Sequence, residues 1–257
     1  MSSASEAAHG TGQGIAGGPP APPHDGHGAA DHGDAHAHAH GPKFLQHHFD
    51  TPAQQFDAAK LGMWAFLGQE LLFFSGLFVA YGIFRSWYPV EFSLSSHQLD
   101  RVMGCGNTLV LLFSSLTAAL AVRSTQVGKK AETSRYLLIT IACACVFLVV
   151  KFFEYQHKFE SGLLPAKYFH PHPAHLHPIG LILPQQAGSF FSIYFMMTGV
   201  HAIHVIVGIG VMIWMWRRNE KGEFSKEYFT PIDITALYWH LVDLIWIYLF
   251  PLLYLID

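Results

Sequence analysis

The sequence predicts an all-α membrane protein, with five transmembrane helices and a disordered amino-terminal tail rich in His, Gly and Ala. Of its 257 residues, 51% are hydrophobic, 14% are aromatic and only 13% are charged, which is unlike an ordinary soluble domain. Five apolar segments are each long enough to cross the hydrocarbon core of a bilayer. These segments cover residues 61–84, 103–122, 136–153, 187–216 and 234–256.

Residues 1–48 contain almost no large apolar side chain before Phe44. Such a segment cannot bury enough surface to offset the entropy lost on ordering, so we expect a disordered cytoplasmic tail. It also lacks the continuous apolar stretch of a secretory signal peptide. Its histidines, dense from His32 to His40, either bind metal weakly or are simply solvated. Residues 49–257 are predicted to form one transmembrane domain.

The first apolar segment, residues 61–84, holds a single carboxylate, Glu70. An ionised carboxylate in hydrocarbon costs several kcal/mol, so we expect Glu70 to be protonated, hydrogen-bonded inside the bundle or close to a water path. A structural role in the bundle interior and a role in handling protons both remain open.

The last two segments carry four further polar side chains at helical spacing, His201, His204, His240 and Asp243. At about 1.5 Å per residue, Glu70, His204 and Asp243 can lie at a similar depth in the membrane. His240 and Asp243 stand three residues apart, which predicts a hydrogen bond or an ion pair. The group is either a polar cluster that holds the helices together or a water-linked proton site facing a partner subunit.

Two features are predicted near the external boundary. Lys151 and Glu154 are three residues apart at the end of the third segment, where both can extend to water, so we interpret them as an interface pair. The long external loop, residues 156–186, sets histidines between prolines, which favour an extended backbone. We expect a docking loop, with metal binding or pH sensing as weaker alternatives because no Cys or acidic partner accompanies them. The weak metal candidates are His170, His172, His175 and His177.

Basic residues predict the orientation. One side of the five spans has ten Lys and Arg residues and the other has five, and the more basic side stays in the cytoplasm. The amino terminus is therefore predicted to be cytoplasmic and the carboxyl terminus external. The ten are Lys43, Lys60, Arg123, Lys129, Lys130, Arg135, Arg217, Arg218, Lys221 and Lys226, and the five are Arg85, Arg101, Lys151, Lys158 and Lys167.

Several classes of function have no support in the sequence. The net charge of −3 offers no basic field for nucleic acid, and no phosphate-binding Gly-rich loop, nucleophile elbow or Cys-x-x-Cys-His haem attachment is present. Histidines three apart on one helix cannot ligate both faces of a haem. Cys105, Cys143 and Cys145 lie in apolar runs, where thiols act as small hydrophobes.

Four motifs in order resemble subunit III of haem-copper terminal oxidases, from about residue 61 to the end. They are Gly68-Gln69-Glu70 before an apolar run, Glu154-Tyr155 at the end of a span, residues 198–205 with the pattern TGxHxxHV, and residues 238–243 with the pattern YWHxVD, followed by Trp246. The last two motifs are the most specific.

The resemblance implies a non-catalytic subunit without a redox centre, which binds no cofactor except phospholipid, while haem and copper lie in partner subunits. It implies direct packing on oxidase subunit I, with subunit II and small or supercomplex subunits nearby, in a bacterial cytoplasmic membrane. Glu70 takes the place of the family's buried helix carboxylate, and His201, His204, His240 and Asp243 take the places of its other polar span residues. Predicted interface or lipid contacts are Trp64, Glu154, Tyr155, Asp233, Trp239 and Trp246.

The sequence departs from many family members in two ways. The first two of seven helices are lacking, and the paired histidines that often precede the last span are replaced by Tyr228 and Phe229. Within the family, we favour a cytochrome c oxidase that reduces oxygen to water and translocates protons over a ubiquinol oxidase. The alternatives of another class are a free-standing proton-coupled transporter and a copper-handling assembly factor, the latter resting on the His-rich segments alone.

Overall fold

The computed structural model describes residues 45–46, 49–165, 168–172, 175–176 and 182–256. The predicted tail therefore lies almost entirely outside the described residues. Within them the chain is helical, and the only β pairing is an isolated bridge between Leu163 and Phe169. The helices are α1 (Pro52–Trp87), α2 (Pro89–Ser96), α3 (Arg101–Val127), α4 (Lys130–Glu160), α5 (Ala187–Glu220) and α6 (Thr230–Tyr254).

All of these helices except α2 are long and apolar enough to cross a membrane, which confirms the predicted all-α protein with five spans. Several helices extend beyond the predicted apolar segments, and polar residues cap the starts of α1 and α3. The Thr51 side chain accepts a hydrogen bond from the Gln54 amide and Pro52 occupies the first turn of α1. Asp100 caps α3 in the same way, and Gly128, with φ of 81°, ends it.

Two predicted boundaries were wrong, and one helix was not predicted. Helix α4 continues to Glu160, so the external segment begins at Ser161 and not at residue 156. Helix α6 ends at Tyr254, two residues before the predicted end. The short helix α2 was not predicted, because its eight residues are too few to show a helical period.

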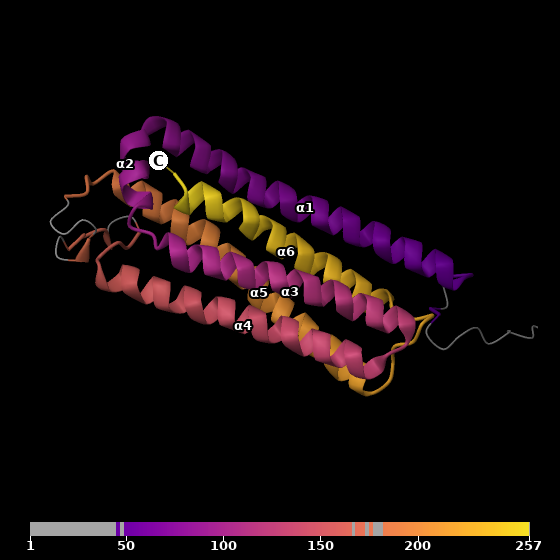
Figure 1. The fold of residues 1–257 in the computed structure, drawn as a ribbon. Coiled ribbons are helices and arrows are strands. Elements are labelled where there is room, and N and C mark those ends of the chain that lie inside the picture. The colour runs from indigo at the N-terminus through magenta and orange to yellow at the C-terminus, as the bar shows by residue number, and fades with distance from the viewer. Residues whose placement is uncertain (1–44, 47–48, 166–167, 173–174, 177–181, 257) are drawn as a thin grey trace, which may run out of the picture. The chain divides into compact units, whose positions relative to one another are not determined.

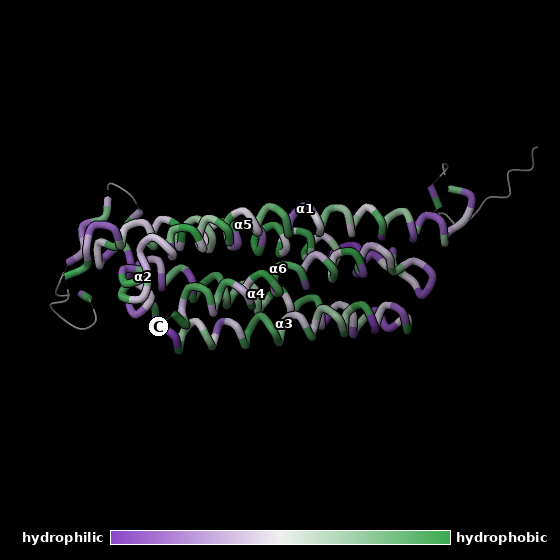
Figure 2. Tube along the Cα trace, turned by 90° about the horizontal axis from the view of Figure 1, so that it is seen from above, coloured by the Kyte–Doolittle hydropathy of each residue, from purple (hydrophilic) through white to green (hydrophobic). Residues whose placement is uncertain are grey.

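Helix α6 occupies the middle of the bundle, in contact with α1, α3 and α5, while α4 packs on α3 and α5 (Figure 1). It is the most buried of the five spans and α1 the least. Trp239, Val242, Trp246 and Leu249 of α6 are completely buried. Figure 2 shows hydrophobic residues along the middle of the long helices and hydrophilic ones gathered toward their ends. The start of α1 and the links α3–α4 and α5–α6 lie at one end of the bundle, and α2 lies at the other (Figure 1).

Small and hydroxyl-bearing residues let the helices approach closely. A Cβ on Gly208 of α5 would lie 2.8 Å from the Trp239 ring of α6, so only glycine fits there. Between α3 and α4 the hydroxyls of Thr117 and Thr140 are 2.8 Å apart. Such contacts are the usual basis of helix association in membranes, where lipid removes the hydrophobic driving force.

Candidate functional site

Glu70 and His204 form a polar contact between α1 and α5. The Glu70 Oε2 and His204 Nε2 atoms are 3.0 Å apart, and the two side chains are 13% and 18% exposed respectively. The rings of Phe73 and Phe74 lie 6.5 and 5.3 Å from the imidazole. Of the three residues predicted to share one depth in the membrane, Glu70 and His204 therefore meet, at the partly open boundary of the bundle, whereas Asp243 makes no hydrogen bond to either.

The hydrogen bonds of His204 determine how many protons this pair holds. Its Nδ1 lies 2.8 Å from the Val200 carbonyl oxygen. A carbonyl oxygen only accepts, so Nδ1 carries a hydrogen and donates it. The contact between Nε2 and Glu70 then also needs one hydrogen, supplied either by a protonated glutamic acid or by an imidazolium ion. The pair therefore shares one dissociable proton that can reside on either partner.

His201, three residues before His204, faces another side of α5. It is completely buried, and its ring centroid lies 5.6 Å from that of Phe147 and 5.2 Å from that of Trp246. Neither ring nitrogen has a hydrogen-bond partner among the described residues. His201 is therefore buried in the interior of the bundle, separate from Glu70.

The predicted bond between His240 and Asp243 was wrong. His240 Nδ1 is instead 2.7 Å from the Ser115 hydroxyl of α3. Asp243 is 2% exposed, and neither carboxylate oxygen makes a hydrogen bond of good geometry to a described residue. Spacing along one helix places two residues on a common face, but α3 supplied a better-positioned partner for His240.

Lys151 and Glu154 were predicted to extend to water, and this was also wrong. Both are buried, with 4% and 5% exposure, and their charged groups are 2.9 Å apart. The hydroxyls of Tyr194 and Tyr254 donate hydrogen bonds to Glu154 Oε1, and the ammonium lies 5.0 Å from the centre of the Trp246 ring. The pair therefore joins α4, α5 and α6 within the bundle.

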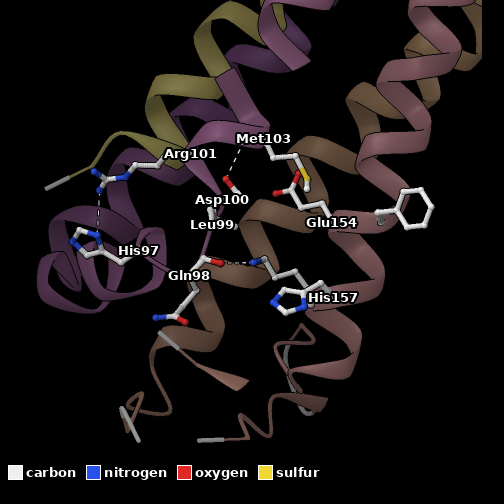
Figure 3. A pocket seen from close by; sticks show the side chains of 10 residues that line it. His97, Gln98, Leu99, Asp100, Arg101, Met103, Glu154 and His157 are labelled. Atoms are coloured by element: carbon white, nitrogen blue, oxygen red, sulfur yellow. Dashed lines mark hydrogen bonds between the residues drawn. The ribbon is translucent and has the colours of Figure 1, made fainter. Parts of the chain in front are cut away.

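A cavity of about 510 Å³ adjoins this ion pair near the end of α4. Its walls come from the link between α2 and α3, the start of α3 and the end of α4, as Figure 3 shows. Glu154 lines it, and the buried Lys158 donates a hydrogen bond to the Gln98 carbonyl at its edge. Acidic and basic side chains, among them Asp100, Arg101 and Lys158, therefore line the cavity together with the buried Glu154.

The predicted interface or lipid residues differ in their exposure and in their partners. Trp64 is 61% exposed and is free to contact lipid or a partner. Asp233 lies 3.3 Å from Lys60 of α1, and Tyr155 bonds the Thr198 hydroxyl of α5 at 2.6 Å. Trp239 and Trp246 are completely buried, so their assignment to a lipid or partner surface was wrong. Their indole N–H groups instead donate to hydroxyls of α3, Ser114 and Thr108.

Sequence reasoning missed Ser115, Tyr194 and Tyr254, which provide partners for the charged and imidazole groups. Hydroxyl-bearing residues are frequent in membrane helices, so nothing in their local pattern separates them from others. A signal was present only for Tyr194 and Tyr254, since buried tyrosine hydroxyls need a partner.

The histidines proposed as weak metal candidates are only partly described. His172 and His175 have ring centroids 6.3 Å apart, whereas His177 lies outside the described residues. In the part of the chain that the structure describes, no group of three or more His, Cys, Asp or Glu side chains comes close enough to hold a metal ion.

Sequence comparisons relate the chain to known proteins. The family described as cytochrome c oxidase subunit III matches residues 185–257, which include His201, His204, His240 and Asp243. The chain is 30% identical to cytochrome c oxidase subunit 3 of Corynebacterium diphtheriae over 204 residues, or 77% of this chain and 87% of the relative. It is 28% identical to the protein of the same name from Synechocystis sp., over 78% of this chain and 76% of the relative.

A similar protein of another name is the probable quinol oxidase subunit 3 of Staphylococcus haemolyticus. It is 24% identical, over 81% of this chain and 94% of the relative. Together with the five spans and the matched motifs, these similarities assign the chain: it is a multi-pass membrane protein of the cytochrome c oxidase subunit III family, within the haem-copper oxidases.

Proposed function

We propose that the chain is the non-redox third subunit of a proton-translocating cytochrome c oxidase, where it stabilises the catalytic subunit I and supports its proton supply. The observation that carries this proposal is the Glu70–His204 pair. It holds one shared proton within the bundle, and both side chains stay partly exposed. Ionisable side chains within a membrane span are costly and mark candidate functional sites.

The position of the pair fits a supporting role. Helix α1 is the least buried of the spans. Phe66 and Phe73, four residues before and three residues after Glu70 and therefore on its side of the helix, are exposed. A partner helix on this face would cover Glu70 and His204 and separate the shared proton from lipid. We assign this face to subunit I, and we propose that an extended subunit I supplies the two helices that the chain lacks.

Further parts of the proposal follow from the family. Haem and copper belong to partner subunits, among them subunit II, and this chain binds phospholipid but no redox cofactor. Small or supercomplex subunits are additional partners. The membrane is the bacterial cytoplasmic membrane, with the amino terminus inside and the carboxyl terminus outside.

A ubiquinol oxidase is the second candidate, favoured by the similarity to probable quinol oxidase subunits 3 of staphylococci. The electron donor is set by subunit II and not by this chain. Isolation of the native complex with mild detergent distinguishes the candidates: a dinuclear copper domain in the co-purified subunit II supports cytochrome c, and its lack supports quinol. Migration of this chain apart from haem absorbance would overturn both and favour a free-standing transporter.

The role of the pair is tested by Glu70→Ala in the intact complex. We expect initial oxygen reduction to be unchanged, and either a shorter active life during turnover or slower proton uptake, because the shared proton is lost. Gln69→Ala, at the exposed neighbour on the same helix, is the matched control and should behave as the parent. Unchanged lifetime and proton stoichiometry in Glu70→Ala would exclude any role beyond packing.

A further inference from the structure

On the long helices α3, α5 and α6, three deeply buried side chains carry polar atoms that no described residue satisfies. These atoms are Oδ1 of Asn107 on α3, both ring nitrogens of His201 on α5, and both carboxylate oxygens of Asp243 on α6. The residues are 3%, 0% and 2% exposed. Buried polar atoms without a partner are rare, because burial removes the hydrogen bonds that they would make to water.

Contacts between the helices put the three groups at neighbouring levels. The Trp246 indole N–H donates to the Thr108 hydroxyl, next to Asn107, and the Trp246 ring packs on His201. Asp243 lies three residues before Trp246, which is about 4.5 Å along the helix axis. Asn107 also donates to the Phe147 carbonyl at 3.3 Å, and the Phe147 ring packs on both Trp246 and His201.

The polar groups nearby do not supply the missing partners. Ser115 lies beside Asp243, and its hydroxyl is 2.7 Å from His240 Nδ1, so it can donate to Asp243 only when Nδ1 supplies the hydrogen of the His240 bond. A hydroxyl has one hydrogen, so it can serve at most one of the two carboxylate oxygens. The buried Lys151 ammonium, which lies over the Trp246 ring, is already bonded to Glu154, Tyr194 and Tyr254.

We propose that bound water occupies this level of the bundle and connects Asp243 to His201, with Asn107 as a third ligand. Water both donates and accepts, so it suits a set that combines a carboxylate, an imidazole with one N–H and one bare nitrogen, and an amide oxygen. A buried water needs two to four polar partners, and three side chains from three helices provide them. This site is separate from the Glu70–His204 pair and lies inside the bundle, where α1 does not contribute.

The direct test is a structure of the intact oxidase complex at a resolution that reveals ordered water. We expect density for at least one water molecule within hydrogen-bond distance of the Asp243 carboxylate, and a continuous link to a ring nitrogen of His201. A direct Asp243–His201 contact, or a dry apolar packing around both groups, would overturn the proposal. This test uses the unaltered complex, so its outcome does not depend on whether variants of the chain assemble.

A double-mutant cycle gives an independent test. Asp243→Leu and His201→Leu each leave water with too few partners, so each should speed the loss of this chain from the complex in detergent about tenfold. The double variant removes both polar partners and should lose the chain more slowly than the product of the two single effects. Multiplicative effects would contradict a shared water site. Thr117→Val with Thr140→Val is the positive control cycle, because these hydroxyls are bonded to each other and their double variant should also lose the chain more slowly than the product of the two single effects.

Discussion

At the scale of single residues, Gly208 sets the distance between α5 and α6. The Trp239 ring lies where a side chain on Gly208 would begin, and Trp239 is completely buried and bonded to Ser114 of α3. The ring therefore cannot move away without breaking contacts on the far side of α6. This close approach also brings Tyr238 of α6 within reach of α5, where its hydroxyl donates to the His204 carbonyl.

We expect Gly208→Ala to destabilise the bundle by about 1–3 kcal/mol, as overpacking of a tight core does. The measurement is the temperature at which this chain dissociates from the purified complex. Gly210→Ala is the matched control on the same helix, because a Cβ there would meet no described atom within 4 Å. Equal dissociation temperatures for the two variants would contradict the close packing of α5 on α6.

At the scale of helices, the Lys151–Glu154 pair binds three spans together. Lys151 donates to Glu154 at 2.9 Å and to Tyr254 at 2.8 Å, and Tyr194 donates to Glu154 at 2.8 Å. Every charged atom of the pair has a partner, which a buried pair requires in order to be stable. Helix α1, in contrast, is held on α5 and α6 by fewer polar ties, including those of Lys60 and Glu70.

Removing one partner of this pair should cost about 3–5 kcal/mol, because it leaves an uncompensated buried charge. We expect Lys151→Met to lower the amount of chain incorporated in the membrane complex, measured by immunoblot against the haem content. Lys151→Met combined with Glu154→Leu should restore part of that amount. Lys129→Ala is the control, since Lys129 pairs with Glu132 on the exposed surface and should be neutral. A double variant no better than the single one would argue against the ion pair as the cause.

At the scale of the whole molecule, the five spans and the distribution of basic residues predict an orientation. Two of the five basic residues counted on the less basic side, Lys151 and Lys158, lie buried in α4, so they contribute no loop charge there. The difference in loop charge between the two sides is therefore larger than the sequence count suggests, which strengthens the prediction of a cytoplasmic amino terminus.

Reporter enzymes fused to the chain test this orientation. A reporter that is active only outside the cytoplasmic membrane should be active when fused after the carboxyl terminus and inactive when inserted at the α3–α4 link, near Gly128. The reverse pattern would show an external amino terminus and a cytoplasmic carboxyl terminus, and would contradict the prediction. Activity at both positions would contradict the three spans, α4, α5 and α6, that separate the two fusion points.

The fold class and much of the candidate site could be predicted from the sequence. Long apolar segments and their order are local properties, so the five spans and the positions of Glu70, His204, His240 and Asp243 on them followed from composition and spacing. The rise of about 1.5 Å per residue also gives the depth of a side chain along its helix, which is why Glu70 and His204 were expected at a common depth. Such reasoning defines where a side chain lies along a helix, but not which neighbour it meets.

Only the tertiary structure decided the partners. The rotation and register of the helices turn His204 toward Glu70 and His240 toward Ser115. They also turn Lys151 and Glu154 inward, where two tyrosines bond them. Asp243 and His201 are left without a hydrogen-bond partner among the described residues. Position in the sequence therefore misjudged the exposure of Lys151 and Glu154, and the assignment of Trp239 and Trp246 to an interface or lipid surface was also wrong. The physical reason is that hydrophobicity and spacing determine which segments enter the membrane, whereas the close fit of side chains between helices determines their rotation and hence each hydrogen bond.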